Sequence, residues 1–256
     1  MDTSATVGAI FDFLDERAPF ATAEEWDNAG LLAGDRDMPV QRILVTLDIT
    51  PAAVEAAAES DAQLIISHHP VIFSPLRALE RGSAPWLLAR RDIAAICAHT
   101  NLDMADGGVN DALAALLGLT AVHTAADGLC RIGRLETPLS PHALAERTSE
   151  RLHTAVRVHA GDRPVRTVCV CGGAGGDCVL PLAAQADALL TGEMRHHEWL
   201  EGARLGATVI EAGHYATEAP VTTVLAAWLR ERFPAVDCAV FDSGAPYETV
   251  GAQTAL

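Results

Sequence analysis

Three short segments rich in histidine and carboxylates each follow an apolar run of the chain. They are Ser67–Pro70 with His68 and His69, His99–Asp103, and Gly213–Glu218 with His214 and Glu218. Imidazole nitrogens and carboxylate oxygens are the donors that zinc and similar divalent metals take from proteins. The residue types and their positions therefore predict a metal site.

Each segment also has an ordinary structural explanation when it is taken alone. His68 and His69 could be capping or surface imidazoles, and Asp103 could simply form a turn. Thr217 could be the N-cap of a helix with Glu218 in its first turn. That last explanation gives His214 no role, whereas a four-residue spacing on a helix would bring His214 and Glu218 to one face.

Taken together, the segments offer more donors than one open tetrahedral site can use. The set suits two ions about 3.5–4 Å apart that share a water and a bridging carboxylate. Glu218 is the natural bridge, because a carboxylate has two oxygens. His99 could be a further ligand, or it could hydrogen-bond to one. Mixed nitrogen and oxygen ligation without thiolate favours Zn, Mn, Fe, Co or Ni over Ca or Mg.

The elements that must position these residues follow from the apolar runs. Strands are expected at 42–48, 63–67 and 93–98, with helices at 5–18, from Pro51, at 84–91 and at 107–118. This alternation indicates βαβ units. The middle of the chain has expected strands at 131–136, 155–159 and 167–171 and a helix at 141–152. Further strands are expected at 187–190, 207–211 and 237–241, with helices at 194–204 and about 217–232.

This pattern predicts an α/β fold. It would consist of two intertwined α/β lobes with largely parallel or mixed sheets flanked by helices. Residues 1–124 plus 186–256 would form the lobe with the metal site. Residues 125–185 would form a second lobe within one compact unit. In such sheets, ligand sites gather at the carboxyl ends of the strands, where the three segments lie.

Composition limits the possible partners and the compartment. The chain has 18 basic and 34 acidic residues and a net charge of −16, which argues against broad binding to nucleic-acid phosphates. No apolar run approaches the ~20 residues needed to cross a bilayer. Of the six cysteines, four lie in apolar runs and are expected to be free thiols in buried strands: Cys97, Cys169, Cys171 and Cys238. Together with the absence of a signal peptide, this favours the cytoplasm over a disulfide framework.

Four other features carry expectations, and the first two leave alternatives open. Glu193, followed by His196 and His197, could be a general base, or it could lie in the first turn of a helix. Gly172–Gly176 could approach a phosphate, although a tight turn near the site is the favoured reading. The turn at Trp26–Gly30 is expected to bury Trp26. Arg195 and Arg77 are the positive groups expected beside the metals.

The motifs as a set resemble one widespread family. Trp26–Gly34, Ser67–Pro70, His99–Asp103, Thr191–Glu193 and His214–Glu218 are similar to motifs of the GTP cyclohydrolase I type 2 homologue family, also described as Ngg-interacting-factor-three-like. The resemblance covers essentially the whole chain, in a short form without a mid-chain insertion. It implies two divalent metals bound by His68, His69, Asp103, His214 and Glu218, with His99 beside them. It also implies a toroidal homohexamer whose metal sites face an internal cavity.

Two functions are expected from different classes. The first is a dinuclear metal-dependent hydrolase in which metal-activated water attacks a small anionic substrate such as a nucleotide or phosphoester. A GTP cyclohydrolase reaction is one candidate, with Glu193 and His99 as catalytic residues. The second is a non-catalytic, metal-binding protein that forms a ring and interacts with other proteins.

Overall fold

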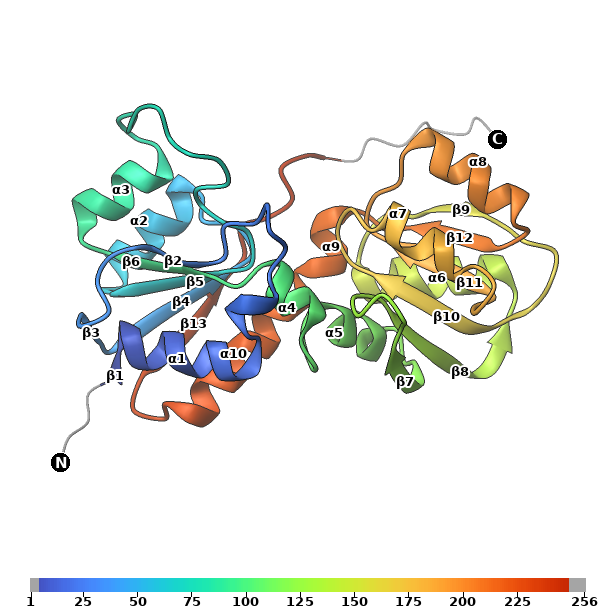
Figure 1. The fold of residues 1–256 in the computed structure, drawn as a ribbon, viewed down its shortest axis with the longest axis horizontal. Helices are drawn as coiled ribbons and strands as arrows, with labels where there is room; N and C mark the ends of the chain where they lie inside the picture. The colour runs from blue at the N-terminus through green and yellow to red at the C-terminus, as the bar shows by residue number, and fades with distance from the viewer. Residues whose placement is uncertain (1–4, 249–256) are drawn as a thin grey trace.

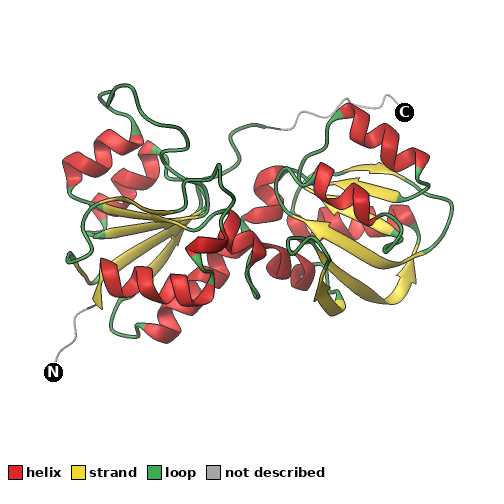
Figure 2. Cartoon of the chain, viewed as in Figure 1, coloured by secondary structure: helices red, strands yellow, loops and turns green. Residues whose placement is uncertain are grey.

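Two large β-sheets, each with helices packed on both faces, make up residues 5–248, the part of the chain that the computed structural model describes (Figure 1). Figure 2 shows the sheets as separate layers, with a group of short helices between them. The expected α/β architecture with mixed sheets is confirmed. None of the helices described in this range combines the length and the apolar character that crossing a bilayer requires.

The first sheet has four parallel strands and one antiparallel edge strand. Its order is β13 (Asp237–Phe241), β4 (Arg42–Thr46), β5 (Leu64–Ser67), β6 (Ala94–Cys97) and β2 (Gly30–Ala33). A short antiparallel pair, β1 (Ala5–Thr6) and β3 (Pro39–Val40), lies beside it. All residues of β5 and β6 are buried, as expected for parallel strands covered on both faces.

Alternate residues of these strands enter two different cores. Leu64 and Ile66 face the core that α1 (Val7–Arg17) and α10 (Pro220–Arg232) complete. Ile65, between them, faces the core of α2 (Pro51–Glu59) and α3 (Ala84–Arg91). The two-residue period of a strand produces this alternation. The sheet is thereby fixed between two helical layers, so the carboxyl ends of its strands are held in place.

The second sheet is mixed. Its order is β7 (Thr120–Thr124), β8 (Arg131–Leu139), β10 (Val165–Cys171), β11 (Ala188–Thr191), β12 (Thr208–Glu211) and β9 (Arg157–His159). The three central strands are parallel, and the others pair antiparallel. One face packs on α5 (Val109–Leu116) and α6 (Pro141–Leu152). The other face packs on α7 (Gly176–Val179), the 3-10 turn η2 (Leu180–Leu182) and α8 (His196–Arg204).

Three helices begin with the same local signal. Thr50, Ser83 and Ser140 are the N-caps of α2, α3 and α6, and each side chain accepts a hydrogen bond from a backbone N–H of the first turn. A proline occupies the first or second helical position in all three, where its missing N–H costs nothing. These starts agree with the helices predicted from Pro51 and at 84–91 and 141–152.

Strand pairing does not follow the expected division of the chain at residues 124 and 186. β11 pairs with β10 and β12 pairs with β11 in the second sheet, and β7 pairs with β8 in the same sheet. An apolar run identifies a buried strand but carries no information about which sheet the strand joins. The helix expected over about 217–232 is also two helices, α9 (His214–Glu218) and α10, and Pro220 begins the second.

Candidate metal centre

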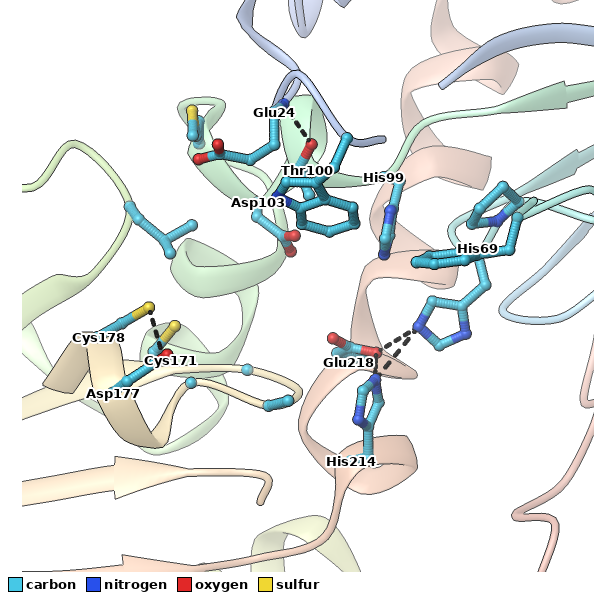
Figure 3. A pocket seen from close by; sticks show the side chains of 18 residues that line it. Glu24, His69, His99, Thr100, Asp103, Cys171, Asp177, Cys178, His214 and Glu218 are labelled. Carbon is cyan, nitrogen blue, oxygen red and sulfur yellow. Dashed lines mark hydrogen bonds and ion pairs between the residues drawn. The ribbon is translucent and has the colours of Figure 1, made fainter. Parts of the chain in front are cut away.

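The three segments predicted to carry chemistry come together between the two sheets. His68 and His69 directly follow β5, and the segment after β6 forms the short helix α4 (Thr100–Met104), which carries Asp103. His214 and Glu218 lie on α9, which follows β12 of the second sheet. The donor groups therefore come from both sheets, and Figure 3 shows His69, Asp103, His214 and Glu218 around one cavity.

Glu218 lies at the centre of the cluster and presents its two oxygens to different partners. Oε2 is 2.9 Å from Nε2 of His69 and 3.0 Å from Nε2 of His214. Oε1 is 3.6 Å from Nε2 of His68. His214 and Glu218 share one turn of α9, as their spacing predicted. Thr217 lies inside that helix rather than at its N-cap, so the alternative explanation of this segment is wrong.

A second group of donors forms around Oε1. Nε2 of His68 lies 3.7 Å from Oδ1 of Asp103. The other ring nitrogen of His68 is 3.0 Å from the carbonyl oxygen of Ala98. Nε2 is buried and makes no hydrogen bond with any of residues 5–248. A buried polar atom without a partner is costly, and a cation between His68, Asp103 and Glu218 would satisfy it.

The donor atoms define overlapping sets that could hold a metal ion. His69, His214 and Glu218 form one set, and His68, Asp103 and Glu218 form another. In each set the donor atoms lie within 4.8 Å of one another. Glu218 belongs to both. The residues therefore fit the expected chemistry of nitrogen and oxygen donors with a shared carboxylate.

Two aspartates that the sequence analysis did not assign to the site hold imidazoles in place. Oδ1 of Asp48 is 2.8 Å from Nδ1 of His69, and Oδ1 of Asp27 is 2.8 Å from Nδ1 of His99. Asp27 also accepts hydrogen bonds from the backbone and hydroxyl of Thr100. A carboxylate on the far side of a ligand imidazole fixes its orientation. Asp48 lies just after β4, which neighbours β5. This position after a buried strand is the sequence signal that could have assigned Asp48 to the site.

His99 joins the cluster from the side of the cavity. One of its ring nitrogens lies within 4.8 Å of donor atoms of His68 and His69. The imidazole rings are close, with centroids 5.1 Å from His68 and 5.5 Å from His69. Burial and the neighbouring charge of His68 lower the pKa of His99. The lowered pKa favours the neutral form of the ring, which has a nitrogen free to accept a proton.

Burial and close packing shift the pKa values of the other groups. Burial raises the pKa of Asp103 to about 6. Burial lowers the pKa of His69, but hydrogen bonds to Asp48 and Glu218 outweigh it and raise that pKa to about 10. Burial raises the pKa of Glu218, but the charge of His68 and the hydrogen bond from His214 hold it well below its usual range. Positive charge is therefore favourable among these carboxylates, and bound cations can replace the protons that supply it.

The glycine-rich segment after β10 is a tight turn against the cluster. The N–H groups of Gly172, Gly173 and Gly175 donate to side chains of Asn110, Thr217 and Thr191, respectively. Because these groups are already used within the protein, the tight-turn reading holds over the phosphate-binding one. Gly173 has φ +60°, and a Cβ there would overlap Oε1 of Glu218. The turn needs glycine so that the backbone can approach the carboxylate.

Glu193 lies at the edge of the site. Its Oε2 is 3.4 Å from Nδ1 of His214, and its side chain is more than half exposed. The helix α8 begins only at His196, so Glu193 is not in a first turn. Arg195 is paired with Glu198 and Asp177 in a neighbouring hollow, and Arg77 is exposed. Within residues 5–248, neither arginine lines the main cavity.

The cavity beside the cluster has a volume of about 700 Å³. His69, Asp103, His214 and Glu218 line it on the side of the cluster. Trp26 lines it as well and is 59% exposed, so the expectation that this side chain is buried is wrong. Asp27 takes the interior position instead, since its carboxylate is held by His99 and Thr100. The four cysteines expected in buried strands are buried, as is Cys130, and none forms a disulfide among the described residues.

The fold and the cluster define a two-sheet α/β protein with a histidine and carboxylate site between its sheets. Residues 5–246 match the family model Duf34/NIF3 (NGG1p interacting factor 3), and the chain belongs to that family. It is 37% identical over 242 residues to a "GTP cyclohydrolase 1 type 2 homolog" of Streptomyces coelicolor, covering 87% of this chain and 85% of the relative.

Two further comparisons agree. A "NIF3-like protein 1" of Drosophila melanogaster is 34% identical over 230 residues, covering 83% of this chain and 77% of the relative. The crystal structure of a hypothetical protein of Staphylococcus aureus superposes with a TM-score of 0.86 at 26% identity, covering 96% of this chain and 99% of that one. The resemblance noted from the motifs is thereby confirmed.

Proposed function

We propose that the protein is a dinuclear metal-dependent hydrolase that acts on a small anionic substrate. The observation that carries the proposal is the position of Glu218, whose two oxygens face two different sets of donors. A nucleotide or a phosphoester is the expected substrate. The opening of a purine ring is among the candidate reactions, because several relatives are named GTP cyclohydrolase 1 type 2 homologues.

The donors divide between two ion positions. His69 and His214 with Oε2 of Glu218 would hold one ion, and His68 and Asp103 with Oε1 would hold the other. Zn, Mn, Fe, Co or Ni would suit these donors. When bound, two such ions lower the pKa of a coordinated water and stabilise negative charge on a substrate.

The residues around the ions have separate tasks. Asp48 orients His69 through Nδ1. His99, held by Asp27 at Nδ1, would move a proton to or from a substrate in the cavity that it lines. Glu193 is the second proposed acid–base residue, since its carboxylate reaches His214 and remains open to solvent.

Metal content and turnover together test the proposal. The purified protein, loaded with Mn or Zn, should hold two ions per chain and hydrolyse GTP or a phosphoester in a screen. Asp103→Ala should reduce the content to one ion and Glu218→Ala to none, with loss of turnover in both. Full activity in His68→Ala, or a single ion that survives in Glu218→Ala at wild-type affinity, would contradict the proposal.

A second candidate is a metal-binding protein without turnover that acts through a protein partner. It is favoured by the description of the family as an interacting factor. We also propose the toroidal hexamer for both candidates. Light scattering should then give six times the 26.9 kDa chain mass. Metal that stabilises this assembly, combined with a blank hydrolase screen, would favour the second candidate over the first.

A further inference from the structure

Two large aromatic side chains are exposed on the cavity beside the metal cluster. Trp26 is 59% exposed and Phe73 is 57% exposed, and both line the cavity. Their ring centroids are 5.9 Å apart and the rings are inclined at 41° to each other. Aromatic rings contribute large apolar areas, and here those areas face a space that a ligand can enter.

The two rings are tied to the site by their neighbours in sequence. Asp27 is held by His99 and Thr100, which fixes the residue after Trp26. The side-chain amide of Asn28 donates to the carbonyl oxygen of Ile72, which fixes the residue before Phe73. The two aromatic segments are thereby joined to each other and to the cluster.

We define Trp26 and Phe73 as the aromatic wall, and the imidazole of His99 lies beside both rings. Its ring stands steeply to both, at 82° to Trp26 with centroids 6.0 Å apart and at 75° to Phe73 with centroids 6.4 Å apart. A planar group stacked on Trp26 would therefore stand steeply to the ring of His99. The ring of His99 is close to those of His68 and His69, so such a group would lie next to the metal cluster.

The polar groups of the cavity outside the cluster include hydrogen-bond acceptors. Glu24 and Asp177 line it at a distance from Glu218 (Figure 3). Carboxylates accept hydrogen bonds from ring N–H and amino groups. These features together favour a ligand with a planar ring that stacks on an aromatic side chain. The edge of that ring would carry N–H or amino groups that donate to the carboxylates.

We propose that Trp26 and Phe73 form a stacking surface for a planar nitrogen heterocycle that carries N–H donors, such as a purine base. The inference deepens the proposed hydrolase function, because it names a heterocyclic base as the part of the substrate that is recognised. It does not require turnover, since stacking on the wall is a binding event.

Guanosine binding to the full-length protein tests the inference. Isothermal titration should show that guanosine binds and that Trp26→Leu or Phe73→Leu weakens its affinity by about 5- to 150-fold, the range for loss of one aromatic stacking contact. Trp26→Phe should restore most of the affinity, because it keeps a ring. Ribose 5-phosphate, which lacks the base, should bind wild type and Trp26→Leu equally.

Leu79→Ala is the matched control, since Leu79 is 53% exposed and lines a different hollow. It should leave guanosine affinity unchanged. The inference is overturned if guanosine does not bind the native protein, or if it binds Trp26→Leu as tightly as wild type. It is also overturned if the aromatic variants, unlike Leu79→Ala, change the mass of the assembly in light scattering and leave guanosine affinity unchanged, since the wall would then contact a second copy.

Metal content and hydrolysis of p-nitrophenyl phosphate separate this inference from the proposed function. If the native protein holds metal and hydrolyses p-nitrophenyl phosphate but does not bind guanosine, only the inference fails. If guanosine binds through Trp26 but no substrate is hydrolysed by the metal-loaded protein, the proposed function fails and the inference stands.

Discussion

Oδ1 of Asp48 lies 2.8 Å from Nδ1 of His69, on the side of the ring opposite to the nitrogen that faces Glu218. The carboxylate fixes which nitrogen is available to the cluster. Asp48→Ala should therefore lower the affinity of the His69 ion position by about 10- to 100-fold, a range typical for such supporting groups. Competition with a coloured chelator measures this affinity.

Asp12→Asn is a suitable control for that substitution. Asp12 lies on α1 and forms an exposed ion pair with Arg36. Loss of this ion pair should leave metal affinity unchanged. Wild-type metal affinity in Asp48→Ala would mean that Asp48 does not position His69.

Gly173→Ala should disrupt the centre directly. An alanine at φ +60° costs about 1–2 kcal/mol, and its Cβ would also displace the carboxylate of Glu218. We expect both a lower melting temperature and loss of bound metal. Gly206→Ala supplies the comparison, because Gly206 has φ +68° with open space around it. It should lower stability similarly while metal content stays at the wild-type value; equal metal loss in both would refute the steric explanation.

The pKa of His69 predicts a pH dependence for protein stripped of metal with a chelator. Hydrogen bonds to Asp48 and Glu218 raise this pKa from 6.5 to about 10 after the opposing effect of burial. A raised folded-state pKa stabilises the fold below about 6.5, and this stabilisation is lost as the pH rises towards 10. The advantage of wild type over His69→Gln in urea unfolding should thus shrink from pH 6.5 to pH 10. A stability advantage of wild type that stays constant or grows over this pH range would contradict the prediction.

Thiol labelling should single out Cys178. It is partly exposed and lines the cavity, whereas the other five cysteines are buried. Burial also raises the pKa of Cys97 well above its usual range, which suppresses the reactive thiolate. Mass spectrometry after brief treatment with N-ethylmaleimide should find one adduct, at Cys178, and none in Cys178→Ser. Early labelling of Cys97 would show that the first sheet opens in solution.

The sequence was informative about which residues gather but not about how the sheets divide. His68, His69, Asp103, His214 and Glu218 could be selected because polar side chains after buried strands meet where strands end. Their convergence is seen in the structure, while their role as ligands remains a prediction. That β12 belongs to the second sheet depends on long-range pairing, which a local apolar pattern does not encode.

Supporting residues were harder to find for a related reason. Asp27 looks like a turn former in sequence, and only the fold brings it within 2.8 Å of His99, 72 positions away. Trp26 was expected inside because large aromatic residues are highly buried on average. Its neighbour Asp27 occupies the interior position through three hydrogen bonds with His99 and Thr100, and Trp26 is left at the cavity.

The origin of the donors has a mechanical consequence. His68 and His69 follow a strand of the first sheet, whereas His214 and Glu218 follow a strand of the second. An ion held by both sets would connect the two halves of the molecule. Affinity for the ion and the rigidity of the junction between the halves are therefore thermodynamically linked. A substitution far from the cavity that alters how the two halves meet would weaken ion retention, and loss of the ion would make their junction less rigid.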